Sequence, residues 1–314
     1  MFTDYAGATM PRPHPTFHLA SAEFEGSAVI TLVAGGLAYP LAALLPVDVT
    51  APGFLHDVFA DWDIWHPLVV AAATLAPESG SAFTPERWLV PVKPSKLVCV
   101  GTNYFDHLKE MGTPHIPSLP YSFLKPVSTG LVATGASVTL PSKSSMVDWE
   151  AELAIVIGHT PRSADASVLD CIAGYTLLND LSARDWIKNK PEVGIDWVMM
   201  KGYDGFSPVG PFITPAEFVV DPQNLGIQLW VNGEIKQDSN TSQMVFSVQQ
   251  ILEHLSSIMT LLPGDVIATG TPAGVGFGQR PQQFLKDGDM VAVEIEGLGR
   301  LETHMVDKHE GVLA

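Results

Sequence analysis

Two glutamates inside an otherwise apolar segment are the first residues whose type and spacing suggest chemistry. The segment Val147–Gly158 reads VDWEAELAIVIG, with Glu150 and Glu152 two residues apart. Alternate side chains of a β-strand point to the same face, so both carboxylates would share one face at one end of a strand that is apolar on both sides. Like charges at that spacing repel each other. The pattern therefore indicates that a cation belongs beside them.

A third carboxylate follows a second apolar run. Asp180 comes directly after CIAGYTLLN. We expect it to hold the same position relative to its strand that Glu150 and Glu152 hold relative to theirs. Oxygen ligands without a nearby histidine or cysteine favour a hard cation, Mg²⁺ first, with Mn²⁺ and Ca²⁺ as the alternatives. The competing interpretation is a solvated strand end whose carboxylates never meet, and the Glu-x-Glu spacing by itself favours it.

A histidine and a glutamate lie three positions apart in GTNYFDHLKEMG. If residues 104–111 form a short helix that ends at Gly112, His107 and Glu110 share one face, where the carboxylate orients the imidazole and raises its basicity. Such a pair is typical of a general base. A single histidine is more often structural, so the spacing alone leaves both interpretations open.

A glycine-rich loop follows the predicted strand in LPGDVIATGTPAGVG. It does not match a nucleotide-binding loop, because no Gly-Lys-Ser/Thr follows and Gln279 stands where the third glycine of G-x-G-x-x-G would lie. Its backbone amides and the Thr271 hydroxyl could hold a small carboxylate. The alternative is an ordinary tight hairpin.

The elements that must position these residues are mostly short apolar runs separated by glycine. They read KLVCVG, LAIVIG, IQLWVNGEI, GDVIATG and DMVAVEIEG, which predicts strands. The clearest helix is predicted over 247–260, where Ser247 and Gln250 form a capping box ahead of an apolar stripe. We therefore expect a β-rich α+β fold with few short helices.

The proline-rich stretch RWLVPVKPSK predicts a boundary between two parts of the chain. We expect a small N-terminal β-rich domain over residues 1–90 and a catalytic domain over residues 91–314. The uncharged stretch over 27–47 is long enough to cross a bilayer, but a double glycine and two prolines interrupt it, which favours a β-hairpin.

Composition narrows the class of protein. The chain carries 34 acidic and 17 basic residues, a net charge of −17, which disfavours nucleic acids and anionic membranes as partners. An anionic substrate would need a local cation. Both cysteines lie in apolar runs and no basic segment precedes an apolar one at the start, so we expect a cytoplasmic protein without disulfides.

Six motifs, in order, resemble the fumarylacetoacetate hydrolase family. They are KLVCVGTNYFDHLKEMG, DWEAELAIVIG, AGYTLLNDLSARDW, KGYDGFSPVGPF, VNGEIKQDSNT and LPGDVIATGTPAGVG, within a match over about residues 92–306. The resemblance implies a mixed β-sandwich roll and a homodimer that binds Mg²⁺ or Mn²⁺. It also implies a 2-oxo acid substrate that bears a second carbonyl or an equivalent group.

The resemblance also assigns roles by position. It makes Glu150, Glu152 and Asp180 the metal ligands, His107 with Glu110 the pair that activates water, and Lys201 the lysine that stabilises charge; Gln237, Thr271 and Arg184 form the substrate-binding set, with Arg184 suited to a supporting position. Trp149 stands where the family usually has tyrosine, and Ile187 where many members have glutamine, which removes one polar contact.

The function implied first is a metal-dependent hydrolase that cleaves the C–C bond of an acylpyruvate or related 2,4-dioxo acid. The intact His107 and Glu110 pair favours it, since hydrolysis needs a base for water. The alternative is a decarboxylase or tautomerase of an oxaloacetate-type 2-oxo acid, or an isomerase or hydratase of a 2-oxo acid from aromatic catabolism. A non-enzymatic binding role is the third.

Overall fold

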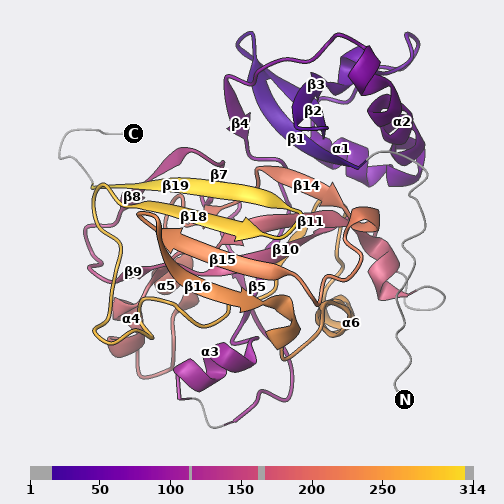
Figure 1. The fold of residues 1–314 in the computed structure, drawn as a ribbon. Helices are drawn as coiled ribbons and strands as arrows, with labels where there is room; N and C mark the ends of the chain where they lie inside the picture. The colour runs from indigo at the N-terminus through magenta and orange to yellow at the C-terminus, as the bar shows by residue number, and fades with distance from the viewer. Residues whose placement is uncertain (1–15, 113–114, 162–166, 308–314) are drawn as a thin grey trace, which may run out of the picture.

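A single ten-stranded sheet runs through both parts of the chain (Figure 1). The computed structural model describes residues 16–112, 115–161 and 167–307. The strand order is β3-β2-β1-β14-β11-β10-β17-β5-β6, with β4 paired to β1. The strands are β1 (Phe17–Phe24), β2 (Ser27–Ala34), β3 (Leu37–Pro40), β4 (Arg87–Leu89), β5 (Leu97–Gly101), β6 (Tyr121–Lys125), β10 (Ala151–Ile157), β11 (Ile172–Asn179), β14 (Phe212–Pro215) and β17 (Val266–Ala268).

A second, five-stranded sheet packs over part of the first, as Figure 1 shows for β15, β18 and β19 in front of β10 and β11. Its order is β16-β15-β18-β19-β8. The strands are β8 (Ala136–Leu140), β15 (Gly226–Val231), β16 (Glu234–Asn240), β18 (Met290–Ile295) and β19 (Gly299–Asp307). Two short pairs complete the roll: β9 (Val147–Asp148) with β12 (Ser182–Ala183), and β7 (Leu131–Val132) with β13 (Ser207–Pro208). The β-rich α+β class is confirmed, and so is the mixed β-sandwich roll.

The central strand β10 is buried on both faces, as the alternation in its sequence predicts. Leu153 and Ile155 belong to the core between the two sheets, whereas Ala154 and Val156 belong to a second core on the opposite face. Helices α1 (Leu55–Ala60) and α2 (Trp62–Leu75) contribute to this second core. These two helices were not predicted from the sequence.

The remaining helices are short and lie mainly near one end of the roll. They are α3 (Phe105–Glu110), α4 (Asp185–Lys188), α5 (Trp197–Lys201) and α6 (Val248–Ile258), and 3-10 turns occupy Leu41–Ala43, Ala76–Glu78, Val168–Cys171, Ala216–Phe218 and Thr241–Gln243. The predicted capping box is present at α6, where Ser247 and Gln250 bond each other's backbone reciprocally. The helix that carries His107 is also confirmed, with Gly112 just after its end.

The uncharged N-terminal stretch forms the predicted hairpin. Strands β2 and β3 pair antiparallel on either side of Gly35 and Gly36, whose φ angles of 58° and 79° suit a two-residue turn of the type that matches strand twist. Within the described residues, no helix combines the length and the apolar character that crossing a membrane requires.

Candidate metal and catalytic site

Antiparallel pairing of β10 and β11 brings the three predicted carboxylates together. Glu150 precedes β10 and Asp180 follows β11, and Ala151 pairs with Asn179 between them. The residues therefore lie at opposite ends of their own strands, not at equivalent ends as the sequence suggested, and they meet because the strands run in opposite directions. Ligand atoms of Glu150, Glu152 and Asp180 all lie within 4.8 Å of one another, and all three residues are buried.

Glu150 is neutralised by two buried cations. Its Oε1 accepts from Arg184 Nη2 at 2.5 Å and its Oε2 accepts from Lys201 Nζ at 2.7 Å. Burial alone would raise the pKa of Glu150, but Lys201, Arg184 and His107 lower it to about 2. Arg184 thus bonds the side chain of Glu150, one of the three candidate metal ligands.

Asp180 lies between two lysines. Lys125 Nζ donates to Asp180 Oδ1 at 2.5 Å, and Lys201 Nζ donates to Asp180 Oδ2. Lys125 also donates to the carbonyl of Phe206 at 2.6 Å. Burial alone would lower the pKa of Lys201, but Asp180 and Glu150 raise it above its usual value, so its ammonium stays charged. Lys125 was missed by the sequence analysis; a lysine that ends the apolar strand YSFLK is its signal.

Glu152 is the carboxylate with the least compensation. It accepts the backbone N–H of Gly270 at 2.7 Å. Burial raises the pKa of Glu152 well above its usual value, and repulsion by Asp180 and Glu150 raises it further. A buried, all-carboxylate set with a charge still uncompensated fits a divalent cation such as Mg²⁺ or Mn²⁺, whose oxygen preference it meets.

The predicted pair of His107 and Glu110 is formed on α3. His107 Nδ1 lies 3.1 Å from Glu110 Oε2, which leaves Nε2 for proton transfer. Glu110 is itself held by the backbone N–H of Gly274 at 2.9 Å. Buried Asn103 fixes the chain ahead of α3 by donating to the carbonyl of Thr269 at 2.8 Å.

The glycine-rich loop binds carboxylates, but they are those of the chain itself. Its amides donate to Asp148, Glu152 and Glu110 through Gly276, Gly270 and Gly274 at 2.7 to 2.9 Å. Gly274 has a φ of 104°, and a Cβ there would lie 2.0 Å from the Lys236 carbonyl oxygen, so only glycine fits. From the sequence, these amides were expected to be able to hold a small carboxylate ligand. In the structure they hold three carboxylate side chains of the site in place.

Gln237 and Thr271 lie side by side at the floor of this loop. Gln237 Nε2 donates to Thr271 Oγ1 and to the carbonyl of Pro272, both at 2.8 Å, and its Oε1 accepts the N–H of Ala151 at 2.9 Å. Gln237 is fully buried, so its amide is committed to holding the loop against β10. Thr271 Oγ1 accepts a hydrogen bond from Gln237, so its hydroxyl proton can still be donated to a substrate. Thr271 is therefore better suited than Gln237 to contact a substrate.

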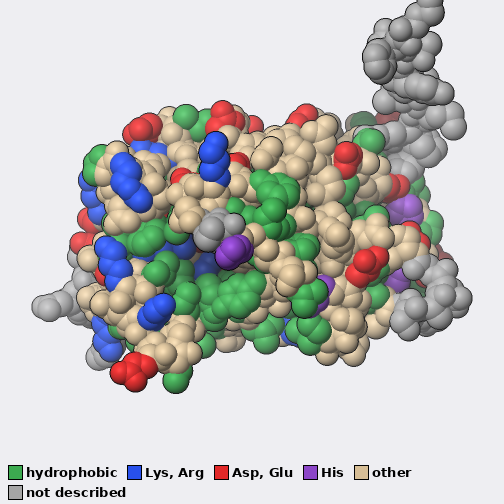
Figure 2. Space-filling view, turned by 90° about the horizontal axis from the view of Figure 1, so that it is seen from below, with side chains coloured by type: hydrophobic (Ala, Val, Ile, Leu, Met, Phe, Trp, Pro, Cys, Tyr) green, Lys and Arg blue, Asp and Glu red, His purple; other side chains and the backbone are tan. Residues whose placement is uncertain are grey.

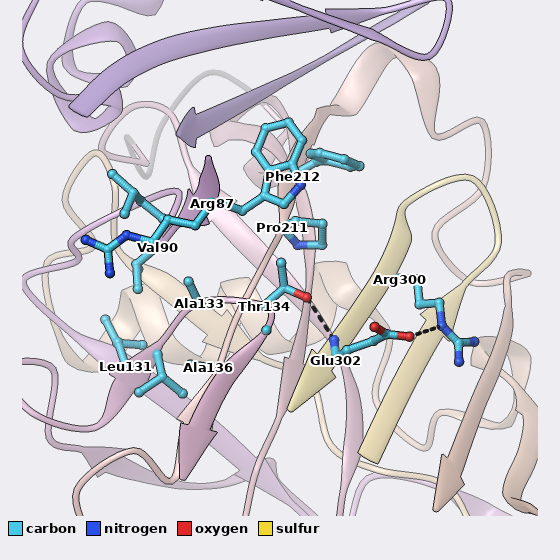
Figure 3. A pocket seen from close by; sticks show the side chains of 14 residues that line it. Arg87, Val90, Leu131, Ala133, Thr134, Ala136, Pro211, Phe212, Arg300 and Glu302 are labelled. Atoms are coloured by element: carbon cyan, nitrogen blue, oxygen red, sulfur yellow. Dashed lines mark hydrogen bonds and ion pairs between the residues drawn. The ribbon is translucent and has the colours of Figure 1, made fainter. Parts of the chain in front are cut away.

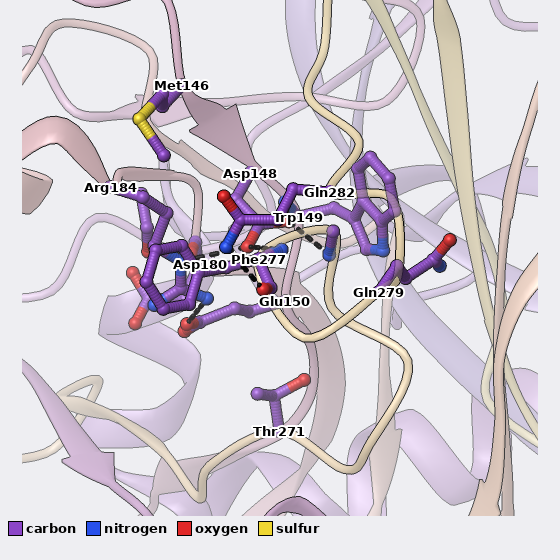
Figure 4. Close-up of polar contacts among 12 residues, drawn as sticks. Met146, Asp148, Trp149, Glu150, Asp180, Arg184, Thr271, Phe277, Gln279 and Gln282 are labelled. Atoms are coloured by element: carbon purple, nitrogen blue, oxygen red, sulfur yellow. Dashed lines mark hydrogen bonds and ion pairs between the residues drawn. The ribbon is translucent and has the colours of Figure 1, made fainter. Parts of the chain in front are cut away.

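Asp148 links the loop to Arg184, which in turn bonds Glu150 of the carboxylate cluster (Figure 4). Asp148 Oδ2 accepts from Arg184 Nε at 2.8 Å and from the N–H of Phe277 at 3.0 Å, while Oδ1 accepts from Gly276. Burial raises its pKa, which Arg184 only partly offsets. Beside it, Trp149 Nε1 donates to the Gly274 carbonyl at 3.0 Å. The sequence analysis missed Asp148, although it lies in the same motif as the glutamates.

We expect Asp148→Ala to lower the free energy of unfolding by about 3–5 kcal/mol, because Arg184 would remain buried with half of its counter-charge. Urea unfolding measures the change. Asp238→Ala is the matched control, since Asp238 is exposed and accepts from the Gln228 side chain at 2.9 Å, and its effect should stay within about 0.5 kcal/mol. Equal losses in both variants would contradict a central role for Asp148.

A large cavity lies in another part of the structure. It measures about 880 Å³ and is lined by residues from β4, β7, β14 and β19, among them Arg87, Phe212 and Glu302 (Figure 3). Its arginines are engaged by the chain's own carboxylates: Arg87 with Glu23 and Arg300 with Glu302. None of the predicted site residues lines it. By contrast, the face that carries α3 is hollowed, with hydrophobic side chains around the hollow and basic ones in it (Figure 2).

The chain is similar in sequence to proteins of a known family. The family model described as fumarylacetoacetate (FAA) hydrolase C-terminal matches residues 96–306. A Homo sapiens protein named oxaloacetate tautomerase FAHD2B, mitochondrial, is 40% identical over 284 residues, which cover 90% of this chain and 85% of the human one.

Two solved structures resemble the whole chain. A fumarylacetoacetate hydrolase from psychrophilic Exiguobacterium antarcticum is 33% identical with a TM-score of 0.77, and the match covers 93% of this chain and 100% of that one. A 2-hydroxyhepta-2,4-diene-1,7-dioate isomerase from Mycobacterium marinum is 34% identical with a TM-score of 0.67, over 94% and 100% of the two chains. The similarity thus includes the N-terminal strands.

Proposed function

We propose that this chain, which belongs to the fumarylacetoacetate hydrolase family, is a divalent-metal-dependent tautomerase of an oxaloacetate-type 2-oxo acid. The observation that carries the proposal is the buried cluster of Glu150, Glu152 and Asp180 with the Lys201 ammonium against two of its members. A relative named as an oxaloacetate tautomerase, aligned over most of both chains, supports this choice over the hydrolase that the sequence favoured.

The substrate is an anion, and the site offers it positive charge in an acidic protein. A divalent ion held by Glu150, Glu152 and Asp180 would act as a Lewis acid toward the 2-oxo group and its carboxylate. Lys201 contributes a second, permanent charge, because neighbouring carboxylates keep its ammonium protonated. It is the group that stabilises negative charge on the 2-oxo oxygen.

His107 carries the proton in this mechanism. Its Nδ1 is committed to Glu110 at 3.1 Å, so Nε2 takes a proton from C3 of the keto acid. The electrons of the C3–H bond form the C2–C3 double bond, and those of the carbonyl π bond move onto the oxygen. A proton from solvent then gives the enol, and His107 returns its own proton to solvent. Glu110 stabilises the imidazolium, and the Gly274 amide keeps Glu110 in place.

The test is the rate of keto–enol conversion of oxaloacetate, followed by the ultraviolet absorbance of the enol. We expect the protein with Mg²⁺ or Mn²⁺ to accelerate the conversion, and a chelator to remove the acceleration. Pyruvate release in the same samples measures decarboxylation. A protein that leaves the tautomerisation rate unchanged at saturating metal would contradict the proposal.

Hydrolysis of an acylpyruvate is the second candidate, and the 3.1 Å contact of His107 with Glu110 favours it, because the same pair suits activation of water. A panel of acylpyruvates, assayed alongside oxaloacetate, separates the two. Higher kcat/KM for C–C cleavage than for tautomerisation would make the protein a hydrolase.

Three further expectations accompany the proposal. The partner is a small 2-oxo acid rather than nucleic acid or a membrane, in line with the net charge of −17. We also propose that the chain forms a homodimer and acts in the cytoplasm, although the human relative's name places that protein in mitochondria. Sedimentation and cell fractionation test these points.

A further inference from the structure

Two residues outside the predicted site form a tightly stacked aromatic pair next to it. The rings of Phe123 on β6 and Trp197 on α5 have centroids 4.4 Å apart and planes within 9° of parallel. Trp197 Nε1 also donates to the hydroxyl of Tyr121 at 2.7 Å, which fixes the orientation of the indole. The pair therefore joins β6 to α5 in one defined geometry.

The same two elements deliver the two lysines of the site. Phe123 and Lys125 are two positions apart on a strand and so share a face, whereas Trp197 and Lys201 are four positions apart on a helix and so share a face. The aromatic members of the two pairs meet in the stack, and the basic members meet on the two oxygens of Asp180. The stack thus fixes the orientation of α5 relative to β6 near the two lysines.

Helix α5 depends on other elements for its stability, and β6 contacts it together with β12 and α4. It has 5 residues, too few for a helix that is stable by itself, and Val198 on it is 70% exposed. Its Asp196 cap accepts from Met199 N at 3.0 Å, and Met200 is buried. Trp197 is the one aromatic residue in this helix, and aromatic pairs of this geometry are among the stronger side-chain contacts.

The stack also contacts the lysine directly. Lys201 Nζ lies 5.0 Å from the centroid of the Phe123 ring and 6.0 Å from that of Trp197. Both distances are within the range of cation–π attraction. The rings therefore attract the same ammonium that Glu150 and Asp180 bind.

We propose that the Phe123–Trp197 stack is a positioning device for Lys201, which holds the ammonium at the carboxylate cluster in the orientation that the reaction needs. The catalytic consequence rests on the proposed function, whereas the position of Lys201 does not. Neither ring is assigned a chemical step.

The experiment measures the rate at which Lys201 is acetylated in the full-length, metal-free protein, by mass spectrometry of the peptide that contains it. Lys201 reacts only when its ammonium leaves the carboxylates. We expect Trp197→Ala to raise this rate about tenfold. Loss of the energy of one aromatic pair would raise the fraction of molecules in which Lys201 is free of the carboxylates by about that factor. Trp197→Phe keeps a stacking ring and should stay within about twofold of the parent. Lys236 on β16, whose ammonium binds Glu234 and Gln283 at 2.8 Å, is the internal reference.

Trp88→Ala is the matched control. Trp88 lies on β4 and packs edge-on against Phe212 with centroids 5.1 Å apart, so its loss removes an aromatic contact far along the sheet from α5. It should leave Lys201 acetylation unchanged. If Trp197→Ala does not fold, Trp197→Leu keeps apolar volume without a ring and takes its place. An unchanged Lys201 rate in the folded variant, or an equal rise in the Trp88 variant or at Lys236, overturns the proposal.

A second measurement separates this proposal from the proposed function. In Trp197→Ala, kcat for tautomerisation should fall about tenfold while Mg²⁺ affinity, measured by calorimetry, stays within about twofold, because the carboxylates remain. Loss of metal affinity equal to the loss of kcat would mean a general collapse of the site and overturn the positioning role. Faster Lys201 acetylation in a protein whose parent lacks tautomerase activity would uphold the positioning of Lys201 and reject the proposed function alone.

Discussion

Replacing His107 with alanine should lower kcat for the keto–enol conversion by about 10²- to 10⁴-fold, the usual contribution of a positioned general base. Mg²⁺ affinity should not change, because His107 lies on α3 and the carboxylates lie at the ends of β10 and β11. Decarboxylation of oxaloacetate depends on polarisation by the metal, a separate contribution, so it should survive within roughly tenfold. Both rates can be followed in one sample, by enol absorbance and by pyruvate release.

His159→Ala is the matched control for this variant, since His159 is an exposed histidine just after β10. Its rates should equal those of the parent. Glu110→Gln should give a smaller loss than His107→Ala, because the imidazole stays but loses its charged partner. Should decarboxylation and tautomerisation fall together at full metal occupancy, His107 would be a substrate-positioning residue and the base would have to be sought elsewhere.

Replacing Glu152 with glutamine should have two effects of opposite sign. Mg²⁺ affinity should fall by more than about 100-fold, since even the loss of a residue that only orients a ligand costs 10- to 100-fold. The metal-free protein should nevertheless unfold at a higher temperature, because burial and the repulsion of Asp180 and Glu150 make the Glu152 charge unfavourable. Calorimetric titration and thermal unfolding in chelator measure the two effects.

The contrast with Glu150→Gln sharpens this result. Glu150 is paired with Arg184 and Lys201, so its replacement leaves two buried cations short of a partner and should lower the unfolding temperature. Glu253→Gln, an exposed change on α6, should alter neither property. A metal-free Glu152→Gln protein that is less stable than the parent, or one that binds Mg²⁺ as the parent does, would remove Glu152 from the metal site.

Local pattern was enough to predict much of the site. Alternation in EAELAIVI predicts a strand buried on both faces, and both cores confirm it. Spacing also places His107 and Glu110 on one helical face, because three residues make almost one turn. The convergence of Asp180 with the glutamates needed the resemblance as well, since strand pairing is a long-range property that no local pattern contains.

What the sequence did not reveal are the groups that compensate charge from a distance. Lys125 lies 55 positions from Asp180, and the Gly276 amide lies 128 positions from Asp148. The local pattern around each partner does not say which carboxylate it will meet, so these contacts become visible only once the sheets are assembled. Helices α1 and α2 were also not predicted: α1 has only 6 residues, and α2 contains Pro67, which argues against a helix in the sequence pattern.

The antiparallel pairing of β1 with β14 covers a strand edge of the second part of the chain. Strand β14 bonds β11 along one side and β1 along the other, with Leu19 opposite Ile213. Removal of residues 1–90 would leave β14 as an exposed edge strand on that second side. Its unpaired N–H and C=O groups could then pair with strands of other molecules. The removal would also uncover the apolar face that α1 and α2 close. Strands β1 to β4 and helices α1 and α2 therefore keep a sheet edge and an apolar face of the chain from contact with other molecules.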